Sequence, residues 1–185
     1  MLFAFQRATA SESWMQSNNY VSATEIVSGV EQGSASSKTE ATGVDIAEVY
    51  KFLKEVGLAP QFDKVDNCVT FDYEAINVKL GAGGEQIYMY TVLSSIEGSK
   101  QLKGRPITVK EELIIHKVCS QMTKTCSCIK FVYEREADAI LVTFESLIPN
   151  MNTFTRYFGT SLEHLFECCV DLYRTMAEQI NATEN

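Results

Sequence analysis

Residues 69–80 read VTFDYEAINVKL and predict two short strands joined by a tight turn. Apolar side chains occupy the odd positions as far as Tyr73 and the even positions from Ile76 onward, and in each half they alternate with polar ones. Alternation with a period of two is typical of a strand with one buried face. Because a continuous strand would keep its phase, the change of phase at Glu74-Ala75 indicates a turn or bulge there.

Further strands are predicted on the C-terminal side of this hairpin. Residues 81–84 read GAGG and predict a second turn. Residues 86–93 read QIYMYTVL and are apolar on both faces, as expected of a central strand. Two more strands are predicted at about residues 126–134 and 139–147, with a turn at residues 136–138. The sequence therefore predicts a sheet of about five strands.

Three helices accompany the strands. The first is predicted at about residues 45–57, the second follows Pro106, and the last begins near Thr160. Each opens with a capping box, in which a polar side chain and an acidic one three positions later satisfy backbone N–H groups. The boxes are Asp45 with Glu48, Thr108 with Glu111, and Thr160 with Glu163. The element order is α-β-β-β-α-β-β-α, and the short turns between neighbouring strands require antiparallel pairing, so the predicted class is α+β.

The chain of 185 residues is long enough for one domain with an appended segment. Residues 28–43 are small and polar, with Val30 as their only bulky apolar side chain, so they bury too little surface to offset their ordering entropy. We therefore predict a mobile N-terminal arm and linker over residues 1–43. A single α+β domain is predicted over residues 44–182.

Composition excludes several classes of function. Lys and Arg number 16 and Asp and Glu 24, which gives a net charge of −8 and a pI near 4.8. Phosphate binding needs clustered basic residues, so no nucleic-acid partner is predicted. No apolar run approaches the roughly 20 residues of a membrane span, and the N-terminus lacks the charge order of a secretory signal. The expected location is the cytoplasm, with no membrane partner.

The six cysteines are predicted to be free thiols, because the core is large enough to fold without disulfides. Cys126 and Cys128 are two positions apart, and a zinc site there would need further ligands from His116, Cys119 or the Cys168-Cys169 pair. None of these has zinc-knuckle spacing. Half-buried thiols are therefore the favoured interpretation, and no metal or other cofactor is predicted.

No catalytic residue is predicted either. Nucleophilic catalysis needs a nucleophile, a base and a group that orients the base. The two histidines, His116 and His164, fall within predicted helices and adjoin no nucleophile motif. Acidic pairs such as Glu111-Glu112 lie at the ends of elements, where charges are normally solvated. The chain is therefore predicted not to be an enzyme.

Three segments carry a resemblance to a known group. They are VDIAEVYKFLKEVGL at residues 44–58, the hairpin at residues 69–80, and KFVYEREADAILVTFE at residues 130–145. With the element order, they resemble the type III secretion chaperone-like superfamily and, within it, the YbjN-domain family, over about residues 44–182. The resemblance implies a small, acidic, non-enzymatic protein. Secretion members of this superfamily dimerise and hold extended partner segments, and the YbjN branch is regulatory.

The expected function is that of a non-catalytic protein-binding module, chaperone-like or regulatory. Apolar side chains on the strand at residues 86–93 and on the last helix would hold a protein or peptide segment, or cover each other in a homodimer. The predicted partner-binding residues are Tyr88, Tyr90, Val92, Phe166, Tyr173 and Met176. The alternatives are a thiol- or metal-dependent regulator, and a small enzyme with carboxylate or thiol chemistry.

Overall fold

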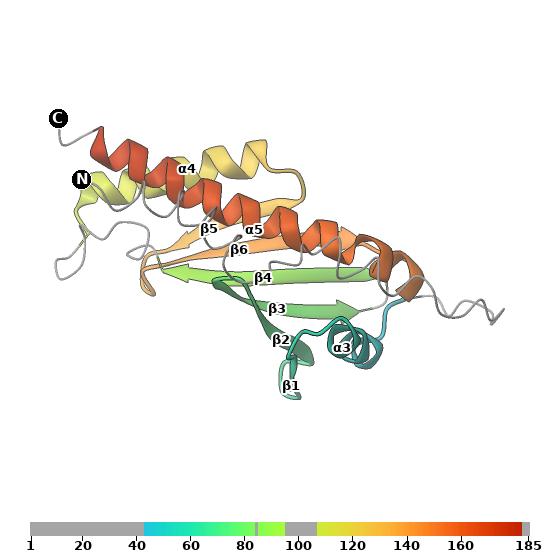
Figure 1. The fold of residues 1–185 in the computed structure, drawn as a ribbon. Coiled ribbons are helices and arrows are strands. Elements are labelled where there is room, and N and C mark those ends of the chain that lie inside the picture. The colour runs from blue at the N-terminus through green and yellow to red at the C-terminus, as the bar shows by residue number, and fades with distance from the viewer. Residues whose placement is uncertain (1–42, 84, 95–106, 183–185) are drawn as a thin grey trace, which may run out of the picture. The chain divides into compact units, whose positions relative to one another are not determined.

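The computed structural model describes residues 43–83, 85–94 and 107–182 (Figure 1). The predicted α+β class is confirmed, with three helices and six strands among these residues. The helices are α3 (Ile46–Glu55), α4 (Val109–Thr125) and α5 (Met151–Asn181). The strands are β1 (Gln61–Asp63), β2 (Cys68–Tyr73), β3 (Ile76–Gly83), β4 (Gln86–Ser94), β5 (Ile129–Glu134) and β6 (Ala139–Leu147). None of the helices described is long and apolar enough to cross a membrane.

The sheet has the strand order β1-β2-β3-β4-β6-β5. β2 and β3 form the hairpin that the sequence predicts, with Tyr73 opposite Ile76 and both side chains buried. Glu74 adopts a φ of 51° in the turn between them, so the change of phase marks a tight turn. β3 then continues to Gly83, so the glycines of the predicted second turn lie largely within the strand.

The sixth strand, β1, is the one that the sequence did not predict. It has only three residues and is mostly exposed, so it shows no alternation. It is added to the sheet edge by antiparallel pairing, with Phe62 opposite Val69 of β2. Tertiary hydrogen bonding, and not a local pattern, makes this segment a strand.

The described residues fall into two compact units. The first unit consists of residues 43–91 and 143–166, and the second of residues 92–142 and 167–182. β4, β6 and α5 each contribute residues to both. The predicted division into an arm at residues 1–43 and one domain stays a prediction, because residues 1–42 lie outside the described residues. Gly43, which is described, donates a backbone hydrogen bond of 2.7 Å to Pro149.

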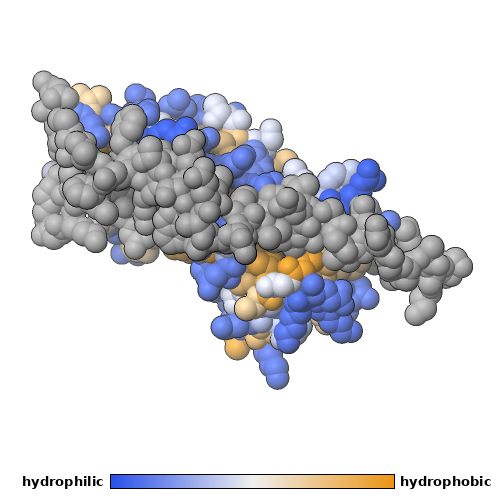
Figure 2. Space-filling view, viewed as in Figure 1, coloured by the Kyte–Doolittle hydropathy of each residue, from blue (hydrophilic) through white to orange (hydrophobic). Residues whose placement is uncertain are grey.

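In the first unit, α3 packs on β2 and β3. Asp45 caps the helix by accepting a hydrogen bond of 2.9 Å from the Ala47 N–H. Gly57, with a φ of 86°, ends the helix, and the Leu58 N–H returns to the Leu53 carbonyl at 3.0 Å, as in a Schellman motif. Figure 2 shows mostly hydrophilic side chains over the region of α3 and β1, with scattered apolar patches between them.

The core of the first unit is an aromatic cluster with ring centroids 5.3–6.1 Å apart. Its members are Phe52 of α3, Phe71 of β2, and Phe154 and Phe158 of α5. Burial of the last two explains why α5 begins at Met151 and not near Thr160. Asn150 caps this start by accepting a hydrogen bond of 2.9 Å from the Thr153 N–H. The predicted capping box at Thr160 is wrong, because that residue lies inside the helix.

In the second unit, the predicted capping box of α4 is confirmed. The Thr108 N–H donates to Glu111 Oε2 at 2.8 Å, and the Glu111 N–H donates to Thr108 Oγ1 at 3.3 Å. This pairing explains why Glu111 can be buried. The helix then continues to Thr125 with Cys126 as its C-cap, so the strand predicted from residue 126 begins only at Ile129.

Candidate functional site

β4 presents aromatic side chains on its solvent-facing side. Burial alternates along the strand: Ile87 and Met89 face the core, while Tyr88 is 37% exposed and Tyr90 is half-buried. The central position of β4, between β3 and β6, agrees with the sequence. Its second apolar face, however, is left open to solvent in the described chain.

The tyrosines are held in place by the neighbouring strand. Gly81 of β3 lies directly opposite Tyr88, and a Cβ built on this glycine would lie only 2.0 Å from Tyr88 Cζ. The ring therefore occupies the space that any side chain at position 81 would need. Tyr90 is opposite Lys79, and the two tyrosine rings are stacked, 6.4 Å apart with an interplanar angle of 21°. We call Lys79, Gly81, Tyr88 and Tyr90 the tyrosine surface.

Lys79 adds a positive charge to this surface. Its Nζ lies 5.7 Å from the centroid of the Tyr90 ring, within the range of a cation–π contact. Tyr90 raises the pKa of Lys79 through its charge and a side-chain hydrogen bond, so the amine stays protonated at neutral pH. Asn77 and Asp72, on the same face of β3 and β2, are joined by a hydrogen bond of 2.8 Å. The surface is thus aromatic and cationic, with a polar margin.

The other predicted partner-binding residues lie elsewhere in the two units. Val92 follows Tyr90 on β4 and is 61% exposed. Phe166 packs edge-on against Tyr73, whose side chain is buried on the core side of β2. The Tyr173 hydroxyl donates to the Ser94 carbonyl at 3.2 Å. Met176 is only 1% exposed, so its prediction as a surface residue is wrong: it faces inward on the apolar stripe of α5.

Sequence reasoning missed Lys79 and Gly81 as members of the surface. A strand glycine opposite an aromatic residue is a recognised pair, in which the ring covers the bare backbone. The signal was present in the sequence, since Gly81 opens the GAGG segment and Tyr88 follows that segment by four residues. Recognising this pair requires the pairing register of β3 with β4. That register differs from the one the sequence predicts, because β3 extends to Gly83.

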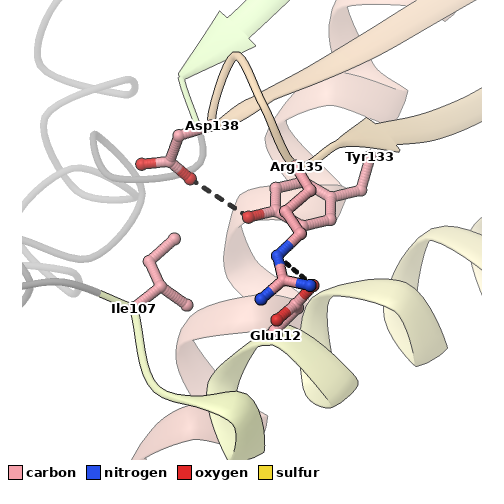
Figure 3. Close-up of a pocket in the computed structure, with 5 residues that line it drawn as sticks. All are labelled: Ile107, Glu112, Tyr133, Arg135 and Asp138. Atoms are coloured by element: carbon pink, nitrogen blue, oxygen red, sulfur yellow. Dashed lines mark hydrogen bonds and ion pairs between the residues drawn. The ribbon is translucent and has the colours of Figure 1, made fainter.

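A pocket of about 230 Å³ lies in the second unit, between the start of α4 and the β5–β6 turn (Figure 3). Arg135 Nε is 3.1 Å from Glu112 Oε1, and the Tyr133 hydroxyl donates to Asp138 Oδ1 at 3.3 Å. Burial, followed by the charge of Asp138, raises the pKa of Tyr133. The polar groups pair with one another across the pocket, which fixes the turn against α4.

All six cysteines are thiols without disulfide bonds. Cys128 is exposed, and burial raises the pKa of Cys119 to about 11 and that of Cys169 to about 12. His116, the histidine considered for a zinc site, packs its ring edge-on against Tyr133. Among the described residues, the five cysteines other than Cys68 belong to no group of three ligand atoms within 4.8 Å of one another.

One such group does exist at the β1–β2 turn, formed by Asp63, Asp66 and Cys68. Asp63 Oδ1 already accepts hydrogen bonds from the Val65 and Asp66 N–H groups, at 2.9 and 3.2 Å. These two bonds are the main cause of the lowered pKa of Asp63. Stabilisation of the turn accounts for the arrangement, and we assign no metal to it.

Comparison with known proteins gives one similarity. No protein-family model matches the sequence, and neither does any curated protein. Among solved structures, YbjN from E. coli, a candidate transcription regulator, is similar with a TM-score of 0.49 and 11% sequence identity. The similarity covers 72% of this chain and 92% of that one. At these values it carries no conclusion about what the chain does.

Proposed function

We propose that this chain is a non-catalytic binding protein that holds an extended segment of a partner protein on its tyrosine surface. The observation that carries the proposal is the stacked, solvent-facing pair of Tyr88 and Tyr90. Tyrosine provides a large contact area and loses little conformational entropy, since it has two side-chain torsions. Here the stack and the contact with Gly81 order the rings before any partner binds, which lowers the entropic cost of binding further.

The chemistry of the surface indicates what the segment looks like. Tyr88 and Tyr90 are two positions apart on one strand, so they match an extended peptide whose apolar side chains also recur every second residue. The protonated Lys79 beside Tyr90 favours an acidic side chain next to these apolar ones. We therefore expect an extended segment of alternating apolar and other residues with one or more acidic positions.

The same chemistry argues against catalysis at this surface. The protonated amine of Lys79 is neither a base nor a nucleophile. We also propose that the protein acts in a reducing compartment such as the cytoplasm, which the six thiols support. The sequence segments quoted above support a chaperone-like or regulatory role of the YbjN type.

Selection from a displayed library of random dodecapeptides on the purified protein tests the proposal. Affinities of the selected peptides are then measured for the wild type, Tyr88→Ala and Tyr90→Ala. We expect roughly 10-fold weaker binding to each variant, as for truncation of an aromatic anchor. Val65→Ala is the control, because Val65 is 92% exposed in the same unit but away from the tyrosine surface.

If Tyr88→Ala and Tyr90→Ala bind the selected peptides as tightly as the wild type and Val65→Ala do, the tyrosine surface is excluded as the binding site. A second copy of the chain is the competing occupant. If light scattering finds a wild-type dimer that Tyr90→Ala converts to a monomer, self-association and not peptide binding covers the surface.

A further inference from the structure

The pocket of the second unit presents groups of both charges to one small space (Figure 3). Glu112 of α4 and Asp138 of the β5–β6 turn supply carboxylates, and Arg135 of the same turn supplies a guanidinium. Two carboxylates against one guanidinium leave a net negative charge, which attracts a cationic group. The guanidinium at the same time attracts an anionic group, so the pocket suits a ligand that carries both charges.

The Arg135 guanidinium has hydrogen-bonding capacity to spare. Its Nε lies 3.1 Å from Glu112 Oε1, and in the described part of the chain it has no hydrogen bond or ion pair with any other residue. A guanidinium carries five N–H donors, and its planar fork matches the two oxygens of a carboxylate. The Arg135 side chain is 74% exposed, so a small anion reaches it without any opening of the fold.

The β5–β6 turn also holds a carboxylate in a fixed position. Tyr133 is 8% exposed, its ring packs edge-on against His116, and its hydroxyl donates to Asp138 Oδ1 at 3.3 Å. Asp138 adopts a φ of 47°, in the left-handed region. A carboxylate held in this way attracts a protonated amine, and the nearby charge of Glu112 adds to that attraction.

The size of the pocket limits the ligand. Its volume of about 230 Å³ equals the volume of about eight water molecules in the liquid, which leaves room for a ligand of about eight non-hydrogen atoms. Ile107, half-buried just before α4, adds an apolar side chain to the wall. The ligand is therefore small, carries a positive and a negative group close together, and has a short apolar part.

We propose that this pocket binds a free aliphatic α-amino acid such as valine or leucine. The carboxylate of the amino acid pairs with the Nη atoms of Arg135. Its ammonium group pairs with the carboxylates of Asp138 and Glu112, and its branched side chain contacts Ile107. The inference stands apart from peptide binding at the tyrosine surface, because it uses different residues in the other unit.

The test is calorimetric titration of the purified full chain with L-leucine and L-valine. Two analogues of leucine serve as matched probes: 4-methylpentanoate, which lacks the amine, and 3-methylbutylamine, which lacks the carboxylate. We expect saturable binding of at least one of the two amino acids. Each analogue should bind roughly 10-fold more weakly than leucine, because each leaves one charged group of the pocket without its partner.

Variants then assign each end of the ligand to a residue. Arg135→Gln should weaken leucine and 4-methylpentanoate by roughly 10-fold and should not weaken 3-methylbutylamine. Asp138→Asn should weaken leucine and 3-methylbutylamine and should not weaken 4-methylpentanoate. Asparagine tolerates the positive φ and still accepts the hydrogen bond from Tyr133, so this variant should fold. Glu136→Gln is the control, since Glu136 is exposed in the same turn and does not line the pocket.

Absence of saturable binding of leucine and valine up to about 10 mM, the weak end of specific affinity, would overturn the proposal. So would tighter binding of 3-methylbutylamine than of leucine, which would make the pocket a site for cations. Equal losses for all three ligands in both variants would mean that Arg135 and Asp138 only stabilise the turn.

Discussion

The two compact units have cores of different chemistry. The first unit is built on the aromatic cluster of four phenylalanines, whose rings meet edge-on or tilted. The second unit contains five of the six cysteines, three of them buried: Cys119, Cys168 and Cys169. Phenylalanine has no proton to lose, whereas a buried thiol titrates and can be oxidised. Solution conditions should therefore act mainly on the second unit, and truncation of aromatic rings mainly on the first.

Removal of one ring from the aromatic cluster should have the largest effect. Phe158 is 2% exposed and contacts three other rings of the cluster, so Phe158→Ala should lower the free energy of unfolding by about 3–5 kcal/mol. Urea denaturation at neutral pH measures this loss. Tyr157→Ala is the control, since Tyr157 is its half-exposed neighbour and should cost far less. Similar losses for both variants would contradict the packing described.

Alkaline pH should have the next-largest effect on stability, and it should act on the second unit. Burial raises the pKa of Cys119 from 9.0 to about 11 in the folded state. Below pH 9 the thiol is protonated in both states and pH has no effect. Above pH 9 the unfolded chain loses this proton first, so stability falls as pH rises toward 11, by on the order of 2 kcal/mol. Denaturation curves between pH 8 and 11 measure the slope.

The matched variant is Cys119→Val, which keeps an apolar side chain but removes the titrating group. Its stability should fall less steeply over the same pH interval. If the wild type and Cys119→Val lose stability in parallel, groups other than the Cys119 thiol cause the loss at alkaline pH. This thiol then does not account for the difference between the two units.

The solvent-facing side of the first unit should respond to a change at Gly81. Because Tyr88 fills the space above it, Gly81→Ala should push the ring away, break the stack with Tyr90 and cost about 1–2 kcal/mol. In a Tyr88→Ala background the same change should cost nothing, since no ring opposes the new methyl group. Thermal unfolding of the four proteins gives the coupling energy, and additive effects would refute the contact.

The smallest effect should be a gain of stability at Thr91. Its hydroxyl is buried on the core side of β4 and, among the described residues, has no hydrogen-bond partner. Thr91→Val removes the polar group and keeps the branched shape, so we expect a gain of about 1 kcal/mol. A loss of stability in thermal unfolding would mean that the hydroxyl is in fact satisfied, and that this core is less strictly apolar than described.

Local signals explain how far the fold followed from the sequence. The hairpin at residues 69–80 and the α4 capping box were predictable, because alternation and capping depend on neighbouring residues. The start of α5 was not, since Phe154 and Phe158 make residues 151–159 helical through burial in the aromatic cluster. β1 was missed for the same reason: its strand character comes from pairing with β2.

The candidate site followed from the sequence only in part. Alternation along β4 placed Tyr88 and Tyr90 together, and the structure adds Lys79 and Gly81 through the register with β3. Met176 was misplaced, because an apolar stripe on a helix does not distinguish residues that face the core from residues that face a partner.

The fit between Gly81 and the Tyr88 ring has a consequence for the protein's descent. A ring that fills the place of a missing Cβ ties the two positions together, so a mutation at one changes which residues are tolerated at the other. Chains related to this one should carry glycine at the position of Gly81 wherever they keep an aromatic residue at the position of Tyr88. Where a larger side chain has replaced the glycine, the aromatic residue should have been lost as well. The pair would therefore be inherited, or abandoned, as a unit.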